Sequence, residues 1–186
     1  MYNIIVKRPL NTEIKELNNF FELVIRDTFA KNNISDLIAS LEEEIIDKKR
    51  CLTEDIESGG KLRYFLVATL DNKIVGTIEH GPANDLIKTC TQGELAELQE
   101  IGTVYVDPKH QNQGIGSLLL TKMFEVLYDK KIEEFCFDSG YKSAQKIWRK
   151  KFGEPEYHLK NYWGDGADHM VWRLNTIDVL QILNLL

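Results

Sequence analysis

A strand, a glycine-containing turn and a helix follow one another near the middle of the chain, and this succession constrains the fold most. The strand pattern spans Gly102–Pro108, the glycines lie in Gln111–Ser117, and the helical pattern runs through Leu118–Leu127. Glycines at a strand-to-helix junction let the backbone curl around an anion and direct its N–H groups toward it. The segment therefore predicts a phosphate-binding turn, and a nucleotide-type cofactor is the first hypothesis.

Two better-known glycine motifs do not fit this turn. A P-loop requires a lysine and then serine or threonine after its last glycine, whereas Gly116 is followed by Ser117 and Leu118. The dinucleotide fingerprint requires a third glycine at the position of Leu119. A tight turn that binds no ligand remains the alternative interpretation.

The composition is that of a single folded domain. The chain has 186 residues, of which 43% are hydrophobic, and this is enough for a sizeable core. The formal net charge of -6 argues against a general nucleic-acid-binding protein, which needs a basic surface. The same charge is compatible with a cationic substrate.

The cysteines and histidines show no spacing typical of a disulfide framework or a metal site. The cysteines are Cys51, Cys90 and Cys136, and the histidines are His80, His110, His158 and His169. The N-terminus lacks a signal-peptide layout, and no apolar run is long enough to span a bilayer. We therefore expect a cytoplasmic protein that binds neither a metal nor a membrane.

Periodicity and turn residues predict an alternating order of strands and helices. The expected strands are 2–7, 64–70, 74–80, 95 or 98 to 106, 135–138, 157–162 and 169–174. The expected helices begin near 11 or 12, near 35 or 36 and near 114, and further helices cover 142–152 and 176–186. Gly81-Pro82 is expected to break a strand, and residues 81–94 remain unassigned.

This order predicts an α+β fold. Strand, helix and strand in succession require a crossover and thus a parallel pair, whereas the hairpins are antiparallel. A mixed α/β sheet covered by helices is expected.

The segment Glu100–Leu120 resembles motif A of the GNAT superfamily, the Gcn5-related N-acetyltransferases. The signature Q/R-x-x-G-x-G/A is met by Gln111, Gly114 and Gly116. The resemblance in element order covers about residues 3–174, and the motif itself covers 98–127. It implies a central, mostly antiparallel mixed sheet with a splayed parallel strand pair, flanked by helices on both faces. Residues 1–174 would form one acetyltransferase domain, and residues 175–186 a short apolar helical extension.

The resemblance implies that acetyl-CoA is the co-substrate and that backbone amides bind its pyrophosphate. The strand end would pair with the pantetheine arm, and a backbone N–H near Tyr105 or Val106 would polarise the thioester carbonyl. Ser143 or Lys142 lies near the place where the family often contacts the cofactor with an asparagine. The implied cofactor-binding residues are Val104, Tyr105, Val106, Gln111, Asn112, Gln113, Gly114, Ile115, Gly116, Ser117 and Ser143.

The acid and the base of the implied reaction are less well marked. An acceptor amine must lose a proton before attack, and a carboxylate can remove it. Glu100 is the first candidate and Glu97 the second, and either is alternatively a solvated carboxylate at a strand end. The tyrosine that many family members place four residues before Gly-Phe is missing, because Arg149 stands there and Glu154 follows the glycine.

Three tyrosines remain as candidates for the general acid. They are Tyr141, Tyr157 and Tyr162.

Two other groups of residues have more than one interpretation. The basic helix with Lys142, Lys146 and Arg149–Lys151 either attracts the 3′-phosphate of CoA or is a solvated face. The aromatic residues Tyr157, Tyr162, Trp163 and Trp172 either line the acceptor cleft or a subunit contact, or pack in the core.

The sequence and the resemblance together predict an acetyl-CoA-dependent N-acetyltransferase. A primary amine of a small molecule or a peptide would attack the thioester directly in a ternary complex. A thiol route through Cys136 or Cys90 is the less favoured mechanism. The alternative from another class is a non-catalytic acyl-CoA-binding sensor or interaction module. The apolar tail after Leu174 must be buried in its own domain or against a partner, so a homodimer is one expectation.

Overall fold

The computed structural model describes residues 4–183. The chain divides into two compact units. The first contains the residues up to His80 and Thr103–Met123, and the second contains Gly81–Gly102 and the residues from Phe124 onward. Strand β4 (Gln99–Val106) and helix α4 (Ile115–Asp129) each run from one unit into the other.

Hydrogen bonds connect the strands in the order β1-β2-β3-β4-β5-β7-β6. Their remaining bounds are β1 Ile5–Lys7, β2 Tyr64–Leu70, β3 Lys73–Pro82, β5 Glu134–Ser139, β6 Tyr157–Leu159 and β7 His169–Asn175. The sheet is mostly antiparallel, and β4 and β5 are its parallel pair, with Gln99 opposite Phe135 and Glu100 opposite Cys136. The predicted fold class is confirmed.

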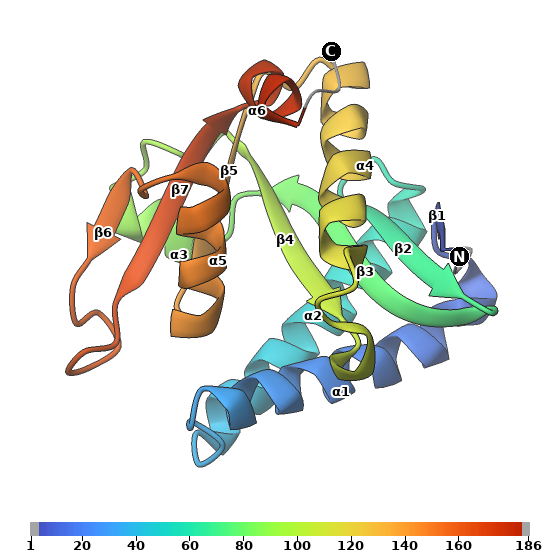
Figure 1. Ribbon diagram of the computed structural model, residues 1–186, viewed down its shortest axis with the longest axis horizontal. Coiled ribbons are helices and arrows are strands. Elements are labelled where there is room, and N and C mark those ends of the chain that lie inside the picture. Colours follow the sequence, from blue (N-terminus) through green and yellow to red (C-terminus); the bar gives the residue numbers. More distant parts are fainter. Residues whose placement is uncertain (1–3, 184–186) are drawn as a thin grey trace. The chain divides into compact units, whose positions relative to one another are not determined.

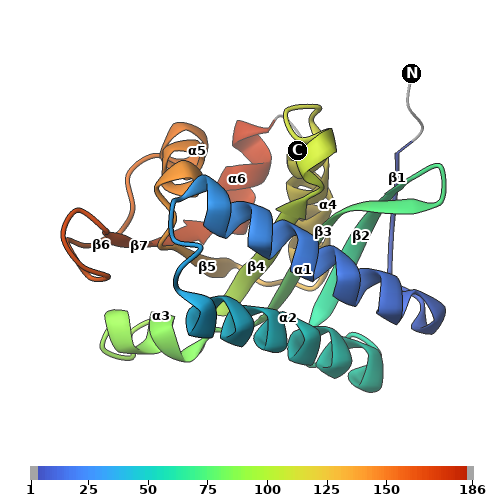
Figure 2. The ribbon, with the colours of Figure 1, turned by 90° about the horizontal axis from the view of Figure 1, so that it is seen from below.

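In the first unit, two long helices cover one face of the strands. A 3₁₀ turn, η1 (Asn11–Glu13), leads into α1 (Ile14–Lys31), which lies beside α2 (Ile38–Ser58) (Figure 2). One face of α1 is apolar and buried, and it includes Leu17, Phe21 and Val24. Phe21 packs against the rings of Phe65 and Tyr105 at centroid distances of 6.1 and 6.3 Å.

The start of α4 packs closely against β3 in the same unit (Figure 1). A Cβ atom added to Gly76 would lie 2.8 Å from Leu119 Cδ1 and 3.0 Å from Ile115 Cγ2. The absence of a side chain at Gly76 therefore lets the first turns of α4 approach the strand.

The second unit contains strands β5, β7 and β6 and three helices. The helices are α3 (Asp85–Cys90), α5 (Lys142–Phe152) and α6 (Thr176–Ile182). Asn84 caps α3, because its side chain accepts a hydrogen bond of 2.7 Å from the N–H of Ile87. The rings of Phe137 and Trp172 stack at 5.0 Å and join β5 to β7.

Two local predictions were wrong or incomplete. The strand ends at Gly81-Pro82 as expected, but two residues later than predicted, because β3 includes both residues and ends at Pro82. A proline at the last position of a strand has few further ladder bonds to interrupt. The unassigned segment 81–94 contains α3.

The ends of the chain follow the sequence-based expectations in part. The tail forms α6, in which Val179 and Leu180 are buried while Ile177 and Ile182 are exposed. Residues 184–186 and the first residues of the expected strand 2–7 lie outside the described residues. Within residues 4–183, no helix is both long and apolar enough to cross a membrane.

Candidate functional site

The end of β4 is fastened by hydrogen bonds within the first unit. Val104, Tyr105 and Val106 are half-buried. The carbonyl of Val106 accepts a hydrogen bond of 3.3 Å from Gln111 Nε2, and Lys31 Nζ donates to Gln111 Oε1 at 2.9 Å. The side chain of Gln111 thus connects the glycine turn to the strand end and to the end of α1.

The turn itself is exposed and adopts left-handed backbone conformations. Asn112 has a φ of 61° and Gly114 a φ of 84°, and both are exposed together with Gln113. Helix α4 begins at Ile115, which is only 1% exposed and anchors the turn in the core. The first turn of a helix directs its N–H groups outward along the axis and is electropositive, so an anion is stabilised there.

The two glycines of the turn have different physical roles. A Cβ atom added to Gly114 would have no heavy atom within 4 Å, so the positive φ of this residue is what favours glycine. Gly116 has no positive φ, and its Cβ would make only an ordinary contact of 3.7 Å with Val106 Cγ2. Because the packing does not require a glycine at 116, the open space there fits the close approach of a ligand.

The side chain of Tyr105 is directed to α2. Its hydroxyl donates a hydrogen bond of 2.8 Å to Glu44 Oε1, and its ring contacts Phe21. The catalytic role expected at Tyr105 belongs to its backbone N–H. The contact of its side chain with Glu44 is separate from that role.

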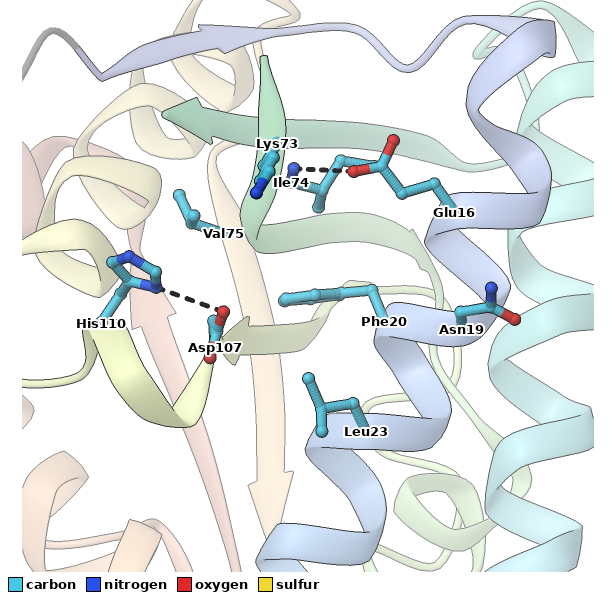
Figure 3. Close-up of a pocket in the computed structure, with 9 residues that line it drawn as sticks. All are labelled: Glu16, Asn19, Phe20, Leu23, Lys73, Ile74, Val75, Asp107 and His110. Atoms are coloured by element: carbon cyan, nitrogen blue, oxygen red, sulfur yellow. Dashed lines mark hydrogen bonds and ion pairs between the residues drawn. The ribbon is translucent and has the colours of Figure 1, made fainter. Parts of the chain in front are cut away.

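A surface pocket of about 370 Å³ lies in the first unit, lined by residues of α1, of β3 and of the segment 107–110 (Figure 3). A 3₁₀ turn, η2 (Pro108–His110), forms one wall, and His110 Nδ1 lies 3.2 Å from Asp107 Oδ2. The lining residues are Glu16, Asn19, Phe20, Leu23, Lys73, Ile74, Val75, Asp107 and His110. The pocket therefore contains none of the predicted cofactor-binding residues, although His110 directly precedes Gln111.

The first candidate base, Glu100, lies in the second unit and is only 7% exposed. Its Oε2 accepts a hydrogen bond of 2.7 Å from the N–H of Asn84, and its Oε1 accepts one of 3.0 Å from Asn84 Nδ2. These bonds fix the orientation of the carboxylate. Glu97 is exposed and has the environment of a solvated carboxylate.

The candidate acids among the tyrosines differ in their surroundings. Tyr157 donates to Glu94, and this hydrogen bond raises the pKa of Tyr157 to about 12. A hydrogen bond with Cys90 raises the pKa of Tyr162. Tyr141 is half-buried and directly precedes α5, in which Ser143 is exposed.

The cysteines are poor nucleophiles in this structure. Burial raises the pKa values of Cys51 and Cys136 to about 12, and it also raises the pKa of Cys90. A thiol with a raised pKa is mostly protonated at neutral pH, and the thiolate is the reactive form. The thiol route is therefore disfavoured.

The basic helix α5 and the aromatic residues of the second unit have different surroundings. A pocket of about 200 Å³ is lined by Lys142, Gln145, Lys146, Arg149, Gly166, Asp168 and Met170. Arg149 also forms an ion pair with Glu154. Trp172 is 1% exposed and belongs to the core, whereas Tyr162 and Trp163 are exposed.

Within residues 4–183, no three histidine, cysteine, aspartate or glutamate side chains come together as a metal site would require.

Solved structures of acetyltransferases share this fold. They include PaiA N-acetyltransferase from Thermoplasma acidophilum in complex with coenzyme A, at 17% identity and a TM-score of 0.65, covering 92% of this chain and 99% of that chain. The ribosomal-protein-alanine N-acetyltransferase from Brucella melitensis has 19% identity and a TM-score of 0.65, covering 92% and 99%. A chimera of the Vibrio cholerae spermidine N-acetyltransferase SpeG and hSSAT has 11% identity and a TM-score of 0.62, covering 95% and 98%.

The sequence itself matches the model of the acetyltransferase (GNAT) family over residues 22–153, which is more than half of the chain. The chain belongs to the GNAT acetyltransferase family. No curated protein sequence matches it.

Proposed function

We propose that this protein is an acetyl-CoA-dependent N-acetyltransferase that acetylates a primary amine by direct attack in a ternary complex. The observation that carries the proposal is the exposed turn before α4, where a left-handed Gly114 leads into a helix N-terminus and Gly116 leaves room for a ligand. Membership of the acetyltransferase family supports the same conclusion.

In this proposal the backbone amides of residues 112–117 bind the pyrophosphate of acetyl-CoA. The partial positive charge at the start of α4 stabilises the anion. Val104–Val106 would pair with the pantetheine arm, and Ser143 would make a further contact with the cofactor. A structural neighbour of the same fold, an N-acetyltransferase, was solved in complex with coenzyme A, which supports the choice of ligand.

In the proposed reaction, the amine nitrogen forms a bond to the thioester carbonyl carbon and the C–S bond breaks. A backbone N–H near Tyr105 or Val106 would stabilise the negative charge on the carbonyl oxygen. CoA leaves as a thiol after taking up a proton. The raised pKa values of the three cysteines favour this direct route over an acyl-enzyme.

Glu100 is the proposed base, acting directly or through a water molecule. A carboxylate has about four lone-pair positions, so the two bonds from Asn84 do not by themselves prevent it from accepting a proton. These bonds would instead hold the carboxylate in one orientation, as a positioned base requires.

The acceptor class is an amine of a small molecule or a peptide. The names of two structural relatives mention a ribosomal-protein alanine and spermidine, which are acceptors of both kinds. The proposal includes a reducing cytoplasmic setting, because the three cysteines are free. It also includes a homodimer, for which the exposed Ile177 and Ile182 of α6 would provide apolar contact area.

A thiol-release assay with acetyl-CoA and a diverse amine panel, combined with calorimetry of CoA binding, tests the proposal. We expect Glu100→Gln to lower turnover steeply while CoA binding is retained, and Glu97→Gln, the exposed control, to behave as wild type. Folded protein that gives no binding heat with saturating CoA would overturn the cofactor site. Equal turnover of Glu100→Gln and wild type would overturn the assignment of the base.

A non-catalytic acyl-CoA sensor is the second candidate. It is favoured by one observation: Arg149, at the position of the family's usual tyrosine, forms an ion pair with Glu154. CoA binding without thiol release across the whole amine panel would support the sensor.

A further inference from the structure

Thr103 in β4 adopts a backbone conformation that threonine normally avoids. Its φ is 51°, although it lies inside a strand and is only 5% exposed. A β-branched residue with a positive φ is a genuine outlier, and such conformations persist only where the surroundings hold them in place.

Two buried hydrogen bonds from β3 hold Thr103. Thr77 Oγ1 donates to the carbonyl oxygen of Thr103 at 3.0 Å, and Thr103 Oγ1 donates to Glu79 Oε1 at 2.9 Å. Thr77 and Glu79 are two residues apart and so lie on the same face of β3. The backbone and the side chain of Thr103 are therefore fixed from one neighbouring strand.

The carboxylate that holds Thr103 is itself supported by an ion pair. Glu79 is 2% exposed, and its Oε2 accepts a hydrogen bond of 2.9 Å from Arg63 Nη1. Arg63 is 8% exposed, and its Nε donates to Glu54 Oε2 at 2.8 Å. A buried ion pair is weak evidence for stability, because desolvation offsets most of the attraction, but it can specify one local geometry.

The residues that follow Thr103 are the strand end to which the proposed function assigns the thioester. A positive φ in a strand interrupts the regular ladder and re-aims the groups that come after it. Donors that stabilise an oxyanion must lie within about 2.7–3.1 Å of it, so their direction is critical.

We propose that Glu79, oriented by Arg63, is a positioning residue that holds Thr103 in its left-handed conformation and thereby directs the backbone amides of Val104–Val106. This inference rests on the proposed function for its catalytic consequence. Its structural part, the direction of the amides, is independent of any activity.

The test compares Thr103→Val, which removes the hydroxyl but keeps the branched shape, with Thr103→Ser, which keeps the hydroxyl. Thr69→Val is the matched control, because Thr69 is 6% exposed and its hydroxyl donates to a strand carbonyl, that of Ile5, at 3.4 Å. We expect Thr103→Val to lower kcat by about tenfold to hundredfold, since a misplacement of about 1 Å can cost this much. The Kd of CoA should rise by less than kcat falls, because the turn at residues 112–117 would still bind the pyrophosphate while the oxyanion donor is misdirected.

Amide NMR shifts of residues 104–106 in the protein without ligand give the second readout. Thr103→Val and Glu79→Gln should both move these signals, whereas Thr103→Ser and Thr69→Val should leave them near their wild-type positions. Unchanged signals in folded Thr103→Val would overturn the inference, whatever the turnover. If the signals move while wild type shows neither CoA binding nor turnover, the positioning role stands and the proposed function fails. Equal losses of kcat in the serine and valine variants would also contradict the role of the hydroxyl.

Discussion

Gly116→Ala should make the protein more stable and its binding of CoA weaker. The added Cβ would lie 3.7 Å from Val106 Cγ2, an ordinary contact, so no steric cost is expected within the protein. Alanine stabilises a helix interior by about 0.5–1 kcal/mol relative to glycine, and somewhat less is expected in the first turn of α4. A gain of about 0.5 kcal/mol corresponds to a rise in Tm of about 1–2 °C for a chain of this size.

The expected loss of affinity for CoA arises because the methyl group added in Gly116→Ala would also contact the bound ligand. If the pyrophosphate approaches the backbone at residue 116, the methyl displaces it and lengthens one or two charge-assisted hydrogen bonds. Such bonds contribute about 1.5–3 kcal/mol each, so the Kd of CoA should rise about tenfold to hundredfold.

Thermal melts of the ligand-free protein and calorimetric titration with CoA measure the two effects separately. Gly114→Ala is the control with the opposite stability effect, because its φ of 84° strains alanine and should lower Tm. A folded Gly116→Ala variant that binds CoA with wild-type affinity would refute the placement of the pyrophosphate at this turn.

Two further predictions concern ionisable groups in the folded protein. At about pH 8 a thiol reagent should label Cys90 before Cys51 and Cys136. Cys90 is only half-buried, whereas the other two thiols are buried and burial raises their pKa values to about 12. Rapid labelling of Cys136 in a peptide map would contradict this order. Burial raises the pKa of Asp55 despite its ion pair with Arg8 at 2.6 Å, so its contribution to stability is largest below the unfolded pKa and is lost as pH rises through the folded pKa. Urea titrations of wild type and Asp55→Asn measure this contribution as the difference between their free energies of unfolding. The difference should be larger at about pH 4 than at about pH 7. A difference that does not grow toward low pH would contradict the raised pKa of Asp55.

The elements with strong periodicity or clear end signals were predicted well from the sequence. The pattern predicts the helix 142–152 at the bounds that α5 has in the structure. Helix α2 ends at Ser58, and Gly59, with a φ of 60°, is its left-handed C-cap, an end signal that glycine marks in the sequence. The sequence pattern does not predict α3, because a six-residue helix is too short to show a period. Its cap, Asn84, binds a strand residue, Glu100, that is distant in sequence.

The turn before α4 was found from its glycines, because glycine marks backbone geometry directly in the sequence. The positive φ of Thr103 had no such mark, since threonine is among the residues least expected there. The contacts of Tyr105 with Glu44 and of Thr103 with Glu79 join residues far apart in the chain, and neither pair shares a motif. Tertiary pairing of this kind cannot be read from local pattern.

The exposed turn at residues 112–114 would act through its peptide groups, and this has a consequence for how the family diverges. Every residue except proline carries a backbone N–H, so most substitutions on the outside of the turn keep the same donors. Selection would then act on the few positions whose backbone conformation matters, such as the left-handed Asn112 and Gly114. The other residues of the turn would be free to change.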